Sequence, residues 1–109
     1  MPIIVRVCRK RIVSNEGQFG GVALLASGNL AAETVTVTEE SSTTTIAAPS
    51  SQFDRRQEVW EFVVSGGDVW AKAGAAPEAS ADDGELFLNG ERIIRAAEVE
   101  GEMWAFAEA

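Results

Sequence analysis

The chain is rich in carboxylates but lacks most of the side chains that enzymes use for proton transfer and nucleophilic attack. Its 109 residues include seventeen Asp and Glu, no histidine, no tyrosine and one cysteine, Cys8. Without histidine, no side chain titrates near neutral pH in its unperturbed state, and no Ser or Cys triad can be completed. A zinc site of the His/Cys type is equally excluded. The chemistry left is that of paired carboxylates, as in glycoside hydrolysis, which needs a deep cleft.

Two acidic pairs, Glu39-Glu40 and Asp82-Asp83, are the first carboxylates to consider for such a role. We interpret both as solvated loop charges, because they lie in polar stretches between apolar runs. The stretch Asp82-Asp83-Gly84-Glu85 also lacks the alternating acidic spacing of an EF-hand calcium loop. We therefore predict no catalytic residue, no cofactor and no metal ligand, and expect a protein that is not an enzyme. A small hydrolase that uses carboxylates is the enzymatic alternative.

Basic residues gather at the start of a chain whose net charge is −8. Four of the nine lie within the first eleven positions and are our candidate partner-binding residues: Arg6, Arg9, Lys10 and Arg11. One interpretation is a strand with Ile3, Val5 and Val7 toward the core and Arg6 toward solvent. Another is a basic arm that docks on an acidic neighbour, such as another copy of the chain. Nucleic acid is the weakest interpretation, because aromatic residues are not interleaved and the acidic remainder repels phosphate.

The elements that must position these residues are strands. Residues 58–64, 69–74 and 102–107 are strand-like runs, and each carries one tryptophan: Trp60, Trp70 and Trp104. The first and last runs alternate large apolar with polar or small residues, which is the side-chain period of a strand with one buried face. In the first run we expect the parity of Trp60, Phe62 and Val64 to face the core.

Further strands are predicted from β-branched residues and alternation. They cover residues 3–8, 11–13, 33–38, 86–88 and 92–95, whereas residues 22–26 fit either a strand or one helical turn. Residues 14–21, 27–29, 41–51 and 75–84 read as loops or connectors, and a helix over 91–100 is the main competing assignment. Ser65 to Asp68 predicts a tight hairpin, and Asn89-Gly90 predicts a type I′ turn.

These elements predict an all-β fold. We expect a small antiparallel β-sandwich, jelly-roll-like, or a partly closed barrel, with about seven to nine short strands. Residues 1–13 form a basic N-terminal strand or arm, and residues 14–109 form a single β domain that is best defined over 57–109. No run of about 18 apolar residues is present for a membrane-spanning helix. The first seven residues do not resemble a secretory signal, so we expect synthesis in the cytoplasm.

Trp70 is the tryptophan that we expect to face a neighbour or a groove. In its run, Val69, Ala71 and Ala73 occupy one side of the strand, and Trp70 shares the other side with Lys72 and Gly74. The apolar side is the one that a core would take. Trp70 is therefore the fifth candidate partner-binding residue.

The second half of the chain resembles a family of small structural proteins of tailed bacteriophages. The resemblance lies in a strand ending in Val69 to Pro77, a loop of small residues, and the closing run Val99-Glu100-Gly101-Glu102-Met103-Trp104-Ala105. It covers roughly residues 40–109 and omits the basic segment. Trp104 and Phe106 are bulkier than the aliphatic residues expected in the closing strand. Members of this family include capsid decoration and head-associated proteins.

The resemblance implies a virion structural protein, most simply a capsid decoration or cement subunit. Its expected partners are the major capsid protein and other copies of itself, with a homotrimer favoured, and its expected place is the capsid surface of the virion after synthesis in the host cytoplasm. The alternatives are a head–tail connector or tail component, and a carbohydrate- or receptor-binding β module of a head or tail fibre. In such a module, an exposed tryptophan would stack on a sugar ring.

Overall fold

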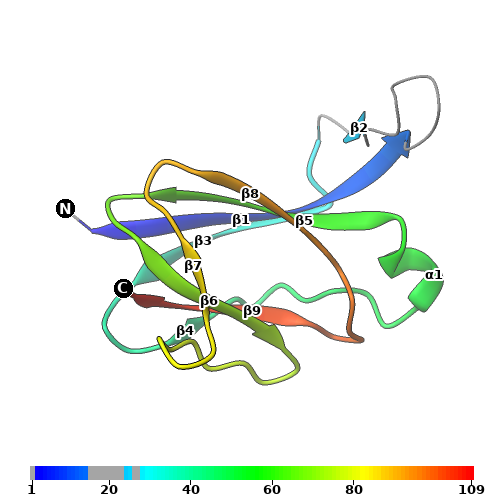
Figure 1. Cartoon of the computed structure of the whole chain (residues 1–109). Helices are drawn as coiled ribbons and strands as arrows, with labels where there is room; N and C mark the ends of the chain where they lie inside the picture. Colours follow the sequence, from blue (N-terminus) through cyan, green and yellow to red (C-terminus); the bar gives the residue numbers. More distant parts are fainter. Residues whose placement is uncertain (1, 15–23, 26–27) are drawn as a thin grey trace.

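The computed structural model describes residues 2–14, 24–25 and 28–109, which form two antiparallel β-sheets packed face to face (Figure 1). Of the loop expected over 14–21, Ser14 is instead the last residue of a strand, and residues 15–21 lie outside the described residues, as do 22–23, 26 and 27. Sheet 1 has five strands, and its members are listed here: β1 (Ile3–Ser14), β2 (Leu24–Leu25), β3 (Ala31–Val37), β5 (Glu58–Ser65) and β8 (Arg92–Ala96). Sheet 2 has four: β4 (Ser42–Thr43), β6 (Val69–Gly74), β7 (Glu85–Phe87) and β9 (Met103–Glu108). The predicted all-β sandwich is confirmed.

Three of the strand pairs are nested along the chain, with β6–β7 innermost, β5 with β8 next and β4 with β9 outermost. The pair β1–β3 lies outside this nest, because both of its strands precede β4. The ladders β1–β5 and β6–β9 then join these pairs side by side, giving the orders β3-β1-β5-β8 and β4-β9-β6-β7. The pairing therefore produces the predicted small antiparallel β-sandwich, and of the predicted jelly-roll-like order it contains the three nested pairs.

The N-terminal basic segment is an internal strand of sheet 1. Strand β1 pairs with β3 along one side and with β5 along the other, over Ile3–Arg9 and Ile4–Arg11. Val5 and Val7 are fully buried, and Arg6 between them is exposed. The described structure therefore contains the first of our interpretations of this segment, a strand with one face in the core.

The core lies between the sheets and is dominated by aromatic rings. Phe62 has ring-centroid distances of 4.8 Å to Trp104, 5.3 Å to Phe87 and 5.7 Å to Phe106, all within the range of favourable aromatic pairs. The predicted core parity of β5 is confirmed, because Trp60, Phe62 and Val64 are at most 1% exposed. The alternation of residue types along β5 therefore identified which face of this strand packs into the core.

The predicted hairpin at Ser65–Asp68 is wrong, because this turn joins two different sheets. Strand β5 belongs to sheet 1 and β6 to sheet 2, and both Val64 and Val69 point into the core from opposite sides. Gly66 has φ +91°, and a Cβ there would lie 2.3 Å from the carbonyl oxygen of Pro2. The glycine is required by the close approach of the chain start, which a hairpin signal in the sequence does not reveal.

The turn at Asn89-Gly90 also crosses between sheets, from β7 to β8. Gly90 has φ +84°, but Asn89 does not have a positive φ, so the predicted type I′ turn is wrong. The strand predicted at 92–95 is confirmed over the helical alternative, since β8 pairs with β5. In both turns, glycine marks a reversal of the chain without specifying which strands pair.

The connector at 41–51 closes one end of the sandwich as a strap. It contains the short strand β4, and Thr44 and Ala48 are buried where their backbone N–H groups donate to the carbonyl oxygens of Trp104 and Glu102 at 2.9 and 2.8 Å. The single-turn helix α1 (Gln52–Arg55), which the sequence did not predict, follows it with Ser51 as N-cap. None of the described helices is long and apolar enough to cross a membrane.

Truncation of Phe62 tests the role of the aromatic core. We expect Phe62→Ala to lower the free energy of unfolding by about 3–5 kcal/mol, since it leaves a cavity among three other rings. Urea unfolding followed by tryptophan fluorescence measures the loss. Val63→Ala on the same strand is the matched control, because Val63 is 39% exposed, and we expect a loss below about 1 kcal/mol. Equal losses for the two variants would contradict the assignment of faces.

Candidate functional site

The four predicted basic residues do not gather at one site, because neighbouring positions on a strand point to opposite faces. Arg6 and Lys10 share the parity that points away from the core, whereas Arg9 and Arg11 share the parity of Val5 and Val7. Arg6 and Arg11 are exposed, and Arg9 and Lys10 are half-buried. The cluster seen in the sequence is thus divided between two sides of β1.

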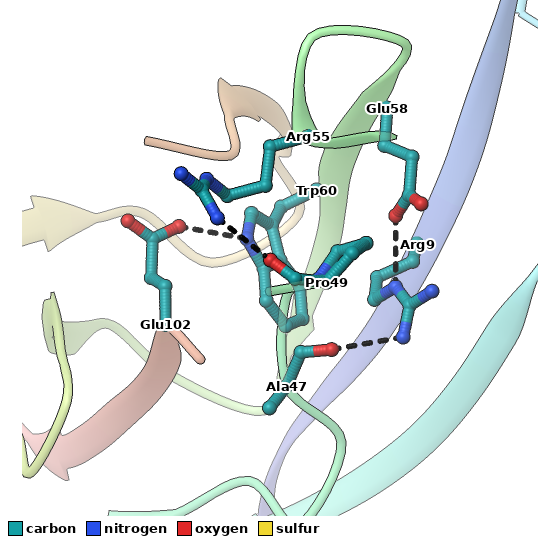
Figure 2. A network of polar contacts seen from close by, with 7 residues as sticks. All are labelled: Arg9, Ala47, Pro49, Arg55, Glu58, Trp60 and Glu102. Carbon is teal, nitrogen blue, oxygen red and sulfur yellow. Dashed lines mark hydrogen bonds and ion pairs between the residues drawn. The ribbon is translucent and has the colours of Figure 1, made fainter. Parts of the chain in front are cut away.

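Arg9 is held inside the chain at the end of the sandwich (Figure 2). Its Nε donates to Oε1 of Glu58 at 2.9 Å, and its Nη1 donates to the carbonyl oxygen of Ala47 at 2.8 Å. The second contact ties the strap to sheet 1. Because these groups use its donors within the chain, Arg9 acts as a structural clamp.

The outer face of sheet 1 is the surface where basic and apolar side chains alternate. We define it by the outward-pointing positions of β1, β5 and β8, which are listed here: Ile4, Arg6, Cys8, Lys10, Val59, Glu61, Val63, Arg92, Ile94 and Ala96. In the register, Arg6 lies beside Val63, and Val63 beside Arg92. Val63 and Ile94 are 39% and 40% exposed. Arginine beside exposed aliphatic residues is typical of protein interfaces.

A buried carboxylate stabilises the centre of this face. Glu61 is 8% exposed, accepts a hydrogen bond from Nε of Arg92 at 2.7 Å and lies 3.8 Å from Nζ of Lys10. The sequence places Glu61 next to a core tryptophan and gives no sign of this pairing. Two of the basic side chains are thus tied to the sheet, and Arg6 stays exposed beside them.

Trp70 lies on the outer face of sheet 2, as its parity predicted. Its indole is half-buried against Ala79, Ala105 and Ala107, whereas Trp60 and Trp104 are 0% and 6% exposed. Leu86, its partner in the register with β7, is 45% exposed. Of the three tryptophans, Trp70 is the one with surface available to a partner.

Glu102 is the polar residue of the core that sequence reasoning missed. It is 3% exposed, and its Oε2 accepts a hydrogen bond from the indole Nε1 of Trp60 at 2.8 Å (Figure 2). Burial raises the pKa of this carboxyl, and the donated hydrogen bond from Trp60 only partly opposes the effect. In the sequence, Glu102 looks like one more acid of the C-terminal run, and its partner is 42 positions away.

A cavity of about 210 Å³ opens beside Glu102 between the two sheets. Its walls include Glu98 and Trp104, and at its rim Arg95 pairs with Glu85. The indole Nε1 of Trp104 is buried without a hydrogen-bond partner among the described residues. In the same described part of the chain, no group of three acidic, histidine or cysteine side chains is arranged to hold a metal ion.

The predicted loop acids lie at the surface. Glu39 and Glu40 line an open hollow of about 510 Å³ together with Glu78, and Asp83 is exposed and pairs with Lys72. This ion pair lowers the pKa of the Asp83 carboxyl, chiefly through the hydrogen bond from Lys72. The interpretation of Asp83 as a solvated loop charge agrees with this placement.

Comparison of the chain with protein-family models, curated proteins and solved structures finds no match. The function of the chain is therefore inferred from its own surfaces and residues.

The raised pKa of Glu102 gives a prediction for the dependence of stability on pH. A carboxyl whose pKa is higher in the folded state contributes stability that is fully present below its unfolded value and is lost as the pH rises through the folded value. We expect Glu102→Gln, which keeps an acceptor for Trp60, to be about 1–3 kcal/mol more stable than wild type at pH 7–8 and no more stable at pH 4. Urea unfolding across this range measures it.

Glu100→Gln is the matched control, because Glu100 is an exposed acid two positions away. We expect it to leave stability within about 0.5 kcal/mol of wild type at each pH. If Glu102→Gln is less stable than wild type at pH 7–8, then contacts in the folded state offset the cost of burying the charged carboxylate, and the prediction is wrong.

Proposed function

We propose that the chain is a non-enzymatic structural protein of a tailed-phage virion, a capsid decoration or cement subunit that bridges major capsid proteins. The observation that carries the proposal is the outer face of sheet 1, where exposed Val63 lies between Arg6 and Arg92, and exposed Ile94 lies opposite Glu61 on the edge strand. The resemblance of residues 40–109 to phage structural proteins supports the same assignment. Such a subunit would be made in the host cytoplasm and bind at the capsid surface.

The physical role of a cement subunit needs a rigid body with an exposed surface that a partner can bind, and two features of the fold support this role. The sheets are joined by an aromatic core in which Phe62 contacts rings of both sheets. The outer face of sheet 1 provides aliphatic area for desolvation, and its exposed Arg6 is available for pairing with an acidic group. We infer that this face binds an acidic, partly apolar surface shared by neighbouring capsid subunits.

Introducing negative charge at the two exposed aliphatic positions of this face tests the proposal. We expect the wild-type chain to co-sediment saturably with capsid shells of the phage that encodes it, and Val63→Glu with Ile94→Glu to weaken binding at least about 10-fold, since it buries unpaired carboxylates in the contact. Leu86→Glu is the control, because Leu86 is 45% exposed on the outer face of sheet 2. A wild-type chain that stays in the supernatant would contradict the function, and equal loss in both variants would contradict the face.

A second function, carbohydrate binding, is favoured by the position of Trp70. Its half-buried ring lies beside exposed Leu86, with the polar Lys72–Asp83 pair and Ser80 nearby. A ring fixed on a sheet with polar groups around it is a surface on which a sugar could stack. The same aromatic would serve a receptor-binding module of a head or tail fibre.

A glycan array separates the two functions. Under the leading proposal, the wild-type chain shows no saturable binding to any glycan. Saturable binding that falls more than about 10-fold in Trp70→Ala, and is retained in Leu88→Ala, would establish the second function instead. Leu88 is a suitable control because it is exposed, at 43%, just beyond the end of β7.

A further inference from the structure

Strand β3 is a long outer strand of sheet 1, coloured cyan beside β1 in Figure 1. Its seven residues, Ala31–Val37, pair with Arg9–Ile3 of β1 on one side. Within the described part of the chain, no backbone hydrogen bond reaches the other side of residues 31–37. An edge of this length presents a row of N–H and C=O groups that can pair with another strand.

The other outer strands carry the features that proteins use to prevent such pairing. Strands β4 and β7 have two and three residues, which is too short for a stable ladder. Strand β8 has five residues and carries Arg92 and Arg95. Short length and charge are both common protections of sheet edges.

Strand β3 has neither protection. Its exposed outward side chains, Ala32, Thr34 and Thr36, are small and uncharged. Its single charge, Glu33, is already bound within the chain, where its Oε1 accepts from the backbone N–H of Thr45 at 2.7 Å and its Oε2 from the Thr45 hydroxyl at 3.0 Å. The edge is therefore uncharged where a second strand would approach.

We propose that β3 pairs with β3 of a second copy of this chain, antiparallel about a twofold axis at Thr34, and so joins two copies of sheet 1 into one continuous sheet. A twofold contact requires a self-complementary surface. With Thr34 opposite Thr34, Ala32 lies opposite Thr36, and no like charges face each other. The same contact at β8 would be shorter, because β8 has five residues where β3 has seven.

The proposed register also covers an exposed apolar residue. Leu30 precedes β3 and is 44% exposed. With Ala31–Val37 paired about Thr34, Leu30 of each copy lies just beyond one end of the ladder, next to the residue that follows Val37 of the other copy. The contact therefore covers apolar area at both ends.

Disulfide trapping of the full chain tests the register. Thr34→Cys should form a disulfide-linked dimer on mild oxidation, because directly opposed residues have Cα atoms about 4.5–5.5 Å apart, within disulfide range. Thr36→Cys is the matched control, since its two copies would be about 13 Å apart, four strand residues, and should not cross-link. The native Cys8 is 3% exposed and does not compete. Equal cross-linking of the two variants, or none with Thr34→Cys, would overturn the register.

Light scattering on the purified chain tests the contact without a disulfide. We expect a dimeric mass for wild type, a monomer for Thr34→Lys, which places two charges at the axis, and a dimer for Ile94→Lys. Circular dichroism confirms that each variant is folded. A folded wild-type monomer would overturn the inference, and a trimer would favour the threefold assembly implied by the resemblance. Because no capsid is involved, this test and the capsid-binding test can fail independently.

Discussion

The structure depends on the packing of aromatic rings between two sheets, with Phe62 at the centre. Phe62 of sheet 1 contacts Trp104, Phe87 and Phe106 of sheet 2, and its own strand neighbour Trp60 lies with its ring centroid 6.2 Å away. A chain of this size has room for one modest core and has no internal disulfide, so this cluster must supply most of the burial that offsets chain entropy. Strand β1 adds Val5 and Val7 to the same core, and this need for buried apolar area explains its position inside sheet 1.

The burial of Glu102 is an exception to this apolar rule, and the hydrogen bond from Trp60 offsets only part of its cost. Trp60 is large enough to span the core and still place its indole N–H at the end of the sandwich, where Glu102 accepts it. The strap is held at the same end by Arg9 and by the carbonyl oxygens of Glu102 and Trp104. Polar contacts therefore fix the end of the sandwich, while the rings fix its middle.

The sequence predicted what depends on local periodicity and missed what depends on distant partners. Alternation identified the buried parity of β5 and the outward position of Trp70, because side-chain direction in a strand is a local property. The turns at Gly66 and Gly90 were predicted as turns, but their strands pair elsewhere, since glycine specifies only a backbone angle. The clamp of Arg9, the pairing of Glu61 and the burial of Glu102 join residues 31 to 51 positions apart, and no spacing rule connects them.

The outer face of sheet 1 is the surface on which the functional account depends. The proposed virion role is tested most directly by cryo-electron microscopy of the phage particle to which the proposal assigns the chain. The account predicts density for the sandwich on the outside of the shell, with Arg6, Val63 and Ile94 against capsid subunits. Density that places this face toward solvent, or a shell without the chain, would contradict the account.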